Sequence, residues 1–213
     1  MIIKVQGQSD LTGFWEPEVA VNYKVKEGYK HNFSVRKRSF IRKEGNTVFD
    51  VRQIDVSHFS GFKLSRNVDA SFGIMYRFRE EFDNGRSDEL RLTQQFNYAY
   101  RPLHIRFGHR IRAEQRITSE RTVHRFRYRF AIDSPLNGQT TDVGEAYVVA
   151  STEALLSVAG DISPEYDQRV TIQMGWLLAK ELRFQTGIEY RIEDYTNGKD
   201  HVAFLLSSLI FSL

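Results

Sequence analysis

The feature that most constrains this chain is an alternation of apolar and polar residues, repeated along almost its whole length. Around residue 74, for example, Phe72, Ile74 and Tyr76 occupy even positions, and Arg77 follows at an odd one. Successive side chains of a β-strand point to opposite faces. A period of two therefore predicts strands with one apolar face and one mostly polar face.

Turn signals such as Glu27-Gly28, Arg101-Pro102 and Asn197-Gly198 separate these segments. No helix-period segment of useful length and no linker interrupts them, so we predict a single all-β domain over residues 1–213. The predicted strands are 14–26, 29–42, 47–65, 70–80, 88–100, 103–116, 121–132, 145–157, 165–176, 182–193 and 202–213.

An alternating meander can close with its apolar face inside, as in a soluble lipocalin-like barrel, or outside, as in a membrane barrel. Segment length favours the membrane form. Many segments span about 11–14 residues, whereas soluble strands average about 5–6 and a tilted membrane strand needs about 9–11. About eleven strands is also more than the lipocalin fold contains.

Residue chemistry favours the same arrangement. Tyr98, Tyr128 and Trp176 lie on the apolar face near strand ends, where membrane barrels carry aromatic girdles. The chain has 21 Arg against 9 Lys, and its polar face is rich in Arg, Glu and Gln rather than Lys, Ser and Thr. Long side chains that pair with one another are suited to filling a barrel lumen.

Connection lengths point the same way from the middle of the chain onward. Arg101-Pro102 is short, whereas 80–88, 157–165 and 193–201 are longer and more polar. Short periplasmic turns and longer outer loops produce such a rhythm. The stretch 133–144 breaks it, because it is long on the side where short turns are expected.

These observations predict a transmembrane antiparallel up-and-down β-barrel in a bacterial outer membrane. Single-chain bacterial barrels have even strand numbers, so we predict 12 strands. Residues 1–12 would supply the twelfth. Alternatively, residues 1–8 are the remnant of a secretion signal, with the small residue Gly7 before Gln8. Both interpretations remain open.

The sequence excludes four features. The chain has no run of about 18 apolar residues, which a transmembrane helix would require. It also has no cysteine, which excludes a disulfide scaffold, a thiolate zinc site and a cysteine nucleophile.

A series of Arg-rich strands carries a family resemblance. The stretches are Glu89–Gln95, His109–Arg116, His124–Arg129, Ser134–Leu136, Glu153 and Tyr166–Arg169. From Phe14-Trp15 onward, their order and spacing resemble a family of small outer-membrane barrels of Bacteroidota called domain of unknown function 2490. The resemblance implies an outer-membrane β-barrel in a Gram-negative envelope. It implies no activity.

By parity, six arginines face the polar side of two adjacent strands. This predicted basic strip consists of Arg106, Arg110, Arg112, Arg125, Arg127 and Arg129. The same parity predicts a second set of charged residues on that face, which could pair with the strip or with one another. This set consists of Glu89, Arg91, Glu114, Glu145, Glu153, Asp167, Arg169, Glu189 and Arg191.

Two hypotheses follow from these lumen charges. In the first, Arg–carboxylate pairs fill the lumen of a structural or accessory envelope barrel. Its partners would be outer-membrane lipid and other outer-membrane proteins in a larger complex. In the second, the strip lines a narrow channel that favours small anionic solutes. The basic residues form no exposed patch with stacking aromatics, so we expect no nucleic-acid partner.

Catalytic signals are weak, and we predict that the protein is not an enzyme. His58 and Ser60 share one strand face, as in outer-membrane phospholipases, but no convincing orienting residue follows, since Asn67 lies in a turn. The remaining histidines lack metal-ligand spacing, so we expect no metal and no cofactor. Asp83, Asp88 and Glu89 could bind Ca²⁺, although a solvated acidic loop fits them better.

Overall fold

The computed structural model describes residues 11–83, 85–160, 162–198 and 200–213. No helix in this described part is long and apolar enough to cross a membrane. The strands are β1 (Thr12–Lys26), β2 (Tyr29–Lys43), β3 (Asn46–Thr47), β4 (Val51–Lys63), β5 (Val68–Phe78), β6 (Glu89–Tyr100), β7 (Arg106–Ile117), β8 (Thr122–Pro135), β9 (Ala146–Ala159), β10 (Ile162–Ala179), β11 (Leu182–Glu193) and β12 (Asp200–Ser212).

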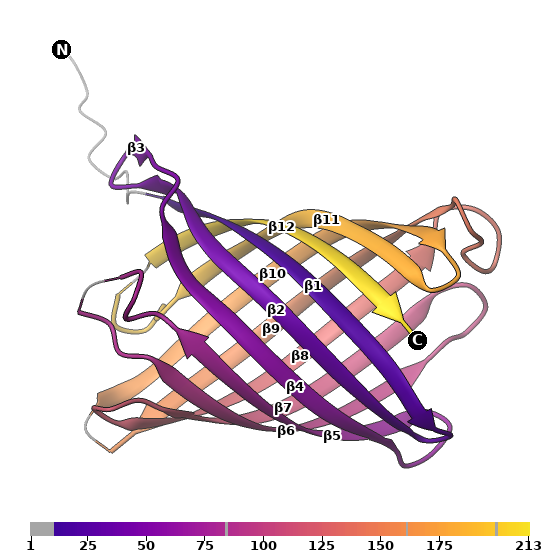
Figure 1. The fold of residues 1–213 in the computed structure, drawn as a ribbon, viewed down its shortest axis with the longest axis horizontal. Helices are drawn as coiled ribbons and strands as arrows, with labels where there is room; N and C mark the ends of the chain where they lie inside the picture. Colours follow the sequence, from indigo (N-terminus) through magenta and orange to yellow (C-terminus); the bar gives the residue numbers. More distant parts are fainter. Residues whose placement is uncertain (1–10, 84, 161, 199) are drawn as a thin grey trace.

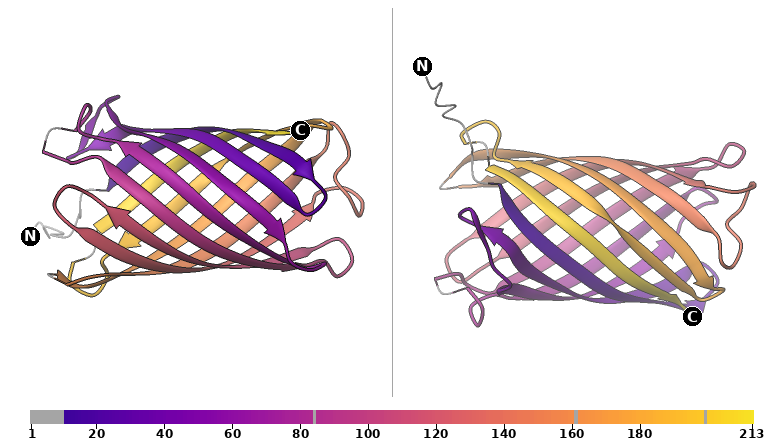
Figure 2. Two further views of the ribbon diagram at one scale, coloured as in Figure 1. Left: turned by 60° about the horizontal axis from the view of Figure 1, so that its bottom comes forward. Right: turned by 90° about the horizontal axis from the view of Figure 1, so that it is seen from above.

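These strands form one sheet that closes into a barrel of tilted strands (Figures 1 and 2). Over the described residues, eleven long strands make the wall, each paired with the next along the chain. The twelfth strand of the sheet, β3, contributes only two residues and pairs with the end of β2. The structure thus confirms the predicted all-β up-and-down barrel.

The barrel closes between β1 and β12, and this seam differs from the predicted antiparallel pairing. The two strands run parallel, in continuous register from Thr12↔Val202 to Asn22↔Ser212. An odd number of up-and-down wall strands forces the first and last to point the same way. The indole Nε1 of Trp15 also donates a 3.2 Å hydrogen bond to Ser207 Oγ across the seam.

All eleven predicted segments correspond to wall strands, with differences at their ends. The predicted longer loop at 157–165 is wrong, because β9 and β10 continue pairing as far as Ala159↔Ile162. The predicted strand 47–65 begins later, at Val51, after the β3 arm. The two interpretations of residues 1–12 concern mainly residues 1–10, which lie outside the described residues; β1 itself begins at Thr12.

The barrel has two mouths. The N-terminal mouth is where β1 begins, and it carries the β2–β4, β5–β6, β7–β8, β9–β10 and β11–β12 connections. The C-terminal mouth is where β12 ends, and it carries the β1–β2, β4–β5, β6–β7, β8–β9 and β10–β11 connections. β1 and β12 run from one to the other in Figure 1.

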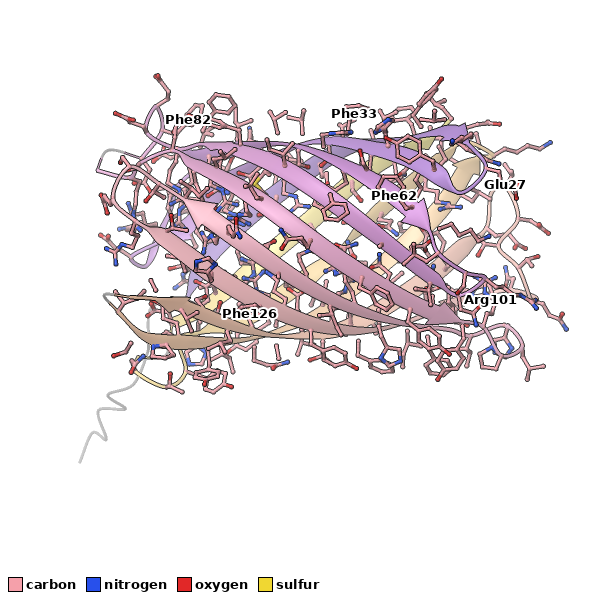
Figure 3. The ribbon with its side chains drawn as sticks, turned by 90° about the horizontal axis from the view of Figure 1, so that it is seen from below. Glu27, Phe33, Phe62, Phe82, Arg101 and Phe126 are labelled. Atoms are coloured by element: carbon pink, nitrogen blue, oxygen red, sulfur yellow. The ribbon has the colours of Figure 1, made fainter. Side chains whose placement is uncertain are left out.

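Burial is inverted relative to a soluble barrel. Large apolar side chains such as Ile111, Phe126 and Ile188 are 60 %, 51 % and 64 % exposed on the outer surface, and Figure 3 shows Phe33 and Phe126 projecting outward from the wall. The buried apolar cluster is small, with Phe14, Val202 and Phe204 at its centre. The buried charged residues are Glu16, Asp55, Arg77, Glu89, Arg91, Glu114, Glu153, Asp167, Arg169 and Arg191.

Candidate functional site: a charged network in the lumen

The lumen network begins between β4 and β5. Arg77 donates from Nε and Nη2 to the two carboxylate oxygens of Asp55, both at 2.7 Å. Gln53 donates to the same carboxylate from the neighbouring lumen position of β4. Arg and Asp occupy paired positions on the two strands, so strand register alone brings the planar guanidinium opposite its carboxylate.

Glu89 and Glu114 extend the network across β6 and β7. Glu89 accepts hydrogen bonds from Arg91 and from Arg116, the latter at 2.7 Å to Nη2, and lies 3.8 Å from Arg77. Glu114 lies 2.8 Å from Arg127 and 3.8 Å from Arg91. Each carboxylate therefore serves more than one guanidinium, which joins the pairs into a chain.

Glu153 and Asp167 continue the chain through β9 and β10. Glu153 accepts a 2.9 Å hydrogen bond from Arg110 and lies 3.5 Å from Arg127. Arg169 lies 3.9 Å from Glu153 and 3.8 Å from Asp167. These residues come from four adjacent strands, so the network follows the lumen wall and is not confined to one hairpin.

β11, β12, β1 and β2 carry further charged pairs on the remaining part of the lumen wall. Arg191 donates a 2.5 Å hydrogen bond to Glu189 and stacks over Phe204, 3.7 Å from the ring centroid. Glu16 of β1 accepts a 2.6 Å hydrogen bond from Arg38 of β2. Ion pairs and cation–π contacts thus occur on both sides of the parallel seam.

The predicted basic strip lies in the lumen, but its members have different surroundings. Arg110, Arg112 and Arg127 belong to the charged network. Arg125 also joins the network, 3.8 Å from Asp167, and donates a 2.8 Å hydrogen bond to Ser157. Arg106 lies near the C-terminal mouth, where its side chain is 53 % exposed and pairs with Asp133 at 2.6 Å.

Arg129 and Glu145, which were also predicted to face the lumen, make no ion pair with the described residues of the charged network. Arg129 makes no ion pair with a described residue, and its Nε is buried without an acceptor. The prediction that Glu145 joins the lumen pairs does not hold. Its carboxylate accepts a 2.9 Å hydrogen bond from the backbone N–H of Asp142 in the same connection, because β9 begins only at Ala146.

Several network residues were not among those selected from the sequence: Glu16, Arg36, Arg38, Asp55, Arg77 and Arg116. Parity identifies most of them, since they alternate with apolar residues in the predicted strands. The predicted lumen charges lie between residues 89 and 191, so those of the first four wall strands, β1, β2, β4 and β5, were missed. The β-bulge that shifts the register between Arg38 and Ser39 has no local sequence signal.

The network divides the lumen into separate cavities among the described residues. One of about 820 Å³ lies toward the N-terminal mouth. Two others, of about 490 Å³ and 280 Å³, lie on the other side of the charged layer. Arg36 and Arg112 line all three cavities, so these two side chains form the partition between them.

His58 and Ser60 lie outside the lumen, on the outer face of β4, and the structure adds His31 of β2 to them. His31 Nδ1 lies 2.8 Å from His58 Nε2 and 3.3 Å from Ser60 Oγ. In a nucleophile–base–orienter arrangement the base uses different ring nitrogens for its two partners. Here one nitrogen makes both contacts. Sequence reasoning missed His31 because the contact depends on cross-strand register.

The acidic residues around the β5–β6 connection are separated from one another. Asp88 accepts backbone hydrogen bonds from Arg79 and Glu80 at 2.7 and 3.0 Å. Glu89 points into the lumen network, and Asp83 lies 3.7 Å from Arg52. Across the described ranges, no group of three or more His, Cys, Asp or Glu side chains is arranged to hold a metal ion.

Comparison with known proteins identifies the family. No curated protein matches the chain, and no solved structure matches it. A family model described as a protein of unknown function, DUF2490, matches residues 12–202, which include every wall strand from β1 to β11 and the start of β12. The chain belongs to the DUF2490 family.

Proposed function

We propose that this protein is an integral β-barrel of a bacterial outer membrane, closed by its own arginine–carboxylate network. In this proposal it acts as a structural or accessory component of the envelope, and not as an enzyme or an open pore. The observation that carries the proposal is the inverted burial: charged side chains fill the lumen while large apolar side chains cover the outside.

The outer surface supports membrane insertion on physical grounds. Exposing so many large apolar side chains to water would cost hydrophobic free energy with no compensation, whereas lipid is a favourable environment for them. Every wall strand has at least 11 residues, enough to cross the hydrocarbon region when tilted. Closure of the sheet also means that every wall strand has a neighbour on each side, so no open sheet edge would face lipid.

The two tryptophans provide a direct test of insertion. Trp15 lies near the N-terminal mouth and Trp176 near the C-terminal mouth, both at outward positions of their strands. Ile111 lies at the middle of β7 and also faces outward. The experiment compares three variants in lipid vesicles, each with a single tryptophan. One retains Trp15, one retains Trp176, and the third carries Ile111→Trp in a Trp15→Phe/Trp176→Phe background.

We expect lipids brominated near the chain ends to quench Ile111→Trp strongly. They should quench Trp15 and Trp176 weakly, because aromatic residues near strand ends lie at the interfaces. Lipids brominated near the headgroup should reverse that order. Absence of quenching at all three positions, in protein with an intact β-sheet circular dichroism spectrum, would refute membrane insertion.

The closed lumen is tested by planar-bilayer conductance. We expect folded protein to give no steady ion-selective openings, because Arg36 and Arg112 separate the cavities with side chains held in ion pairs. Stable openings in the unmodified protein would contradict this part of the proposal. Co-purification from native membranes tests the accessory role, and recovery of the lone monomer under gentle detergent would count against it.

An anion-preferring channel is the second candidate, and the C-terminal half of the lumen favours it. Arg106, Arg110 and Arg129 line the 490 Å³ cavity, and Arg129 has no ion-pair partner among the described residues. Such a strip would attract small anions. The channel hypothesis requires openings whose anion selectivity reverses in Arg110→Glu, and silent bilayers with folded protein would exclude it.

We propose a structural role for the His31–His58–Ser60 group, because one imidazole nitrogen contacts both neighbours. A hydrolase would instead show phospholipid turnover that Ser60→Ala abolishes. We expect no turnover above that of the Ser60→Ala variant.

A further inference from the structure

The cavity at the N-terminal mouth has a basic wall and an acidic wall. Arg52, Arg79 and Arg86 line it from β4 and the β5–β6 connection. Glu165 and Asp200 line it from the side of β10 and β12. The β5–β6 connection lies at this mouth, where Figure 3 labels Phe82. At about 820 Å³ the cavity has room for a small organic ion and several waters.

Two of the three arginines of the basic wall make no ion pair among the described residues, and the third, Arg52, makes only a long one. Arg79 makes no ion pair with any described residue, and its Nε is buried without an acceptor. Arg52 Nε is buried without an acceptor as well, and its nearest carboxylate, Asp83, is 3.7 Å away. Arg86 is exposed at the rim, and in the described ranges it has no ion-pair partner.

Aromatic rings orient one of these cations. The guanidinium of Arg52 lies 5.1 Å from the ring centroid of Phe14 and 5.5 Å from that of Phe40. Cation–π contacts hold the group in place without consuming its hydrogen-bond donors. Arg52 is therefore positioned and still able to donate to a ligand.

The electrostatic environment of the basic wall favours the binding of an anion against it. Burial lowers the pKa of Arg79 to about 10. The guanidinium groups of Arg77 and Arg52 act in the same direction, and the carboxylate of Glu89 offsets them only in part. Clustered guanidinium groups with unused donors are costly unless an anion compensates them. Of the carboxylates on the opposite wall, Asp167 and Glu193 lie 3.8 and 3.6 Å from arginines of β10 and β11, on their own side of the cavity.

We propose that Arg52, Arg79 and Arg86 form a binding site for a phosphate monoester at the N-terminal mouth. The planar guanidinium fork matches the oxygens of a phosphate dianion. The carboxylates across the cavity would repel the ligand toward the arginine side and so define its position. The site lies outside the charged partition and does not depend on whether the lumen conducts.

Calorimetric titration of the folded protein in nonionic detergent micelles tests the site. Two probes distinguish the source of the phosphate group: glucose 6-phosphate in solution, and phosphatidic acid mixed into the micelles. We expect saturable binding of at least one, and the one that binds identifies whether the ligand is a free solute or a lipid headgroup. Saturation by neither probe would overturn the proposal.

Variants locate the site. Arg79→Gln and Arg52→Gln should each weaken binding about tenfold or more, because each removes charge-assisted hydrogen bonds. The matched control is Arg101→Gln, which removes an exposed arginine at the opposite mouth (Figure 3) and should leave binding unchanged. Equal losses in all three variants would indicate non-specific attraction to a basic protein and would refute the site.

A thermal-shift measurement distinguishes loss of ligand binding from misfolding of the variants. Ligand that binds only the folded state raises the unfolding temperature with concentration. The shift should occur in the unmodified protein and in Arg101→Gln, and should be reduced in Arg79→Gln even if that variant unfolds at a different temperature. An undiminished shift in both Arg79→Gln and Arg52→Gln would contradict the proposal.

Discussion

Arg77 and Asp55 form the most complete ion pair in the lumen, a two-pronged contact with both hydrogen bonds at 2.7 Å. Both residues are buried, at 6 % and 4 % exposure. Their positions on neighbouring strands follow from the β4–β5 register. The pair shows one way in which the barrel places charges in its interior: strand register sets a guanidinium opposite a carboxylate.

Asp55→Ala should therefore destabilise the barrel strongly, because it leaves a buried guanidinium without its partner. Loss of one member of a buried pair costs about 3–5 kcal/mol. The measurement is urea unfolding in detergent micelles or vesicles. Glu120→Ala provides the control, since Glu120 is exposed in the β7–β8 connection. A double variant, Asp55→Leu/Arg77→Met, should recover much of the loss, and failure to recover would contradict the ion-pair explanation.

Removing the partition should change conductance. Arg36 and Arg112 line all three lumen cavities, so Arg36→Ala/Arg112→Ala should join them and produce openings that the unmodified protein lacks. Planar-bilayer recording measures the effect. The double variant Arg101→Ala/Arg121→Ala, which alters exposed connections, should stay silent. If the partition variant is folded and equally silent, these two side chains do not close the lumen.

An arginine on the outer face should be tolerated only outside the lipid. Ile188 faces outward near the middle of β11 and is 64 % exposed. Ile188→Arg should cost about 2–4 kcal/mol in vesicles, the range for a charge near the bilayer midplane. Phe49→Arg, in the β3–β4 connection, changes a residue that is 78 % exposed and should cost little. Equal costs in unfolding titrations would argue against a lipid-facing surface.

Gly187 should be irreplaceable for steric reasons. A Cβ there would lie 2.2 Å from the backbone carbonyl oxygen of Ile172 and 2.6 Å from Gln173 Cα. Neither atom can move without distorting the β10–β11 pairing. Gly187→Ala should lower stability by about 1–3 kcal/mol. Gly108→Ala is the matched strand control, because its nearest neighbour is 4.0 Å away. Unfolding midpoints that shift equally would show that the contact is not the cause.

The β5–β6 connection should loosen in acid. Backbone N–H groups of Arg79 and Glu80 donate to Asp88 and lower the pKa of its carboxyl below the ordinary value of 3.8. A depressed carboxyl pKa stabilises the folded connection above pH 3.8, and that stabilisation disappears as pH falls through the folded-state pKa. Amide exchange at Arg79 and Glu80 should accelerate over this range. In Asp88→Asn the acceleration should be absent, and its persistence would assign the effect to another group.

The order of elements was predictable because its signal is local. Alternation over 70–80 requires only that strand side chains point to opposite faces, and β5 covers Val68–Phe78. Parity also predicted correctly that residues such as Arg110 and Glu153 face the lumen. Glu145 is the exception. It precedes the first residue of β9, and side chains alternate between two faces only within a strand.

The sequence by itself determined the all-β barrel, the approximate strand boundaries and the separation of apolar and charged faces, since each depends on neighbours in the chain. The tertiary structure alone decided the parallel β1–β12 seam, the identity of each ion pair and the contact of His31 with Ser60. These depend on register between strands up to 192 residues apart, as Trp15 and Ser207 are. It also decided which arginines remain without carboxylates, because pairing depends on the whole circumference of the lumen.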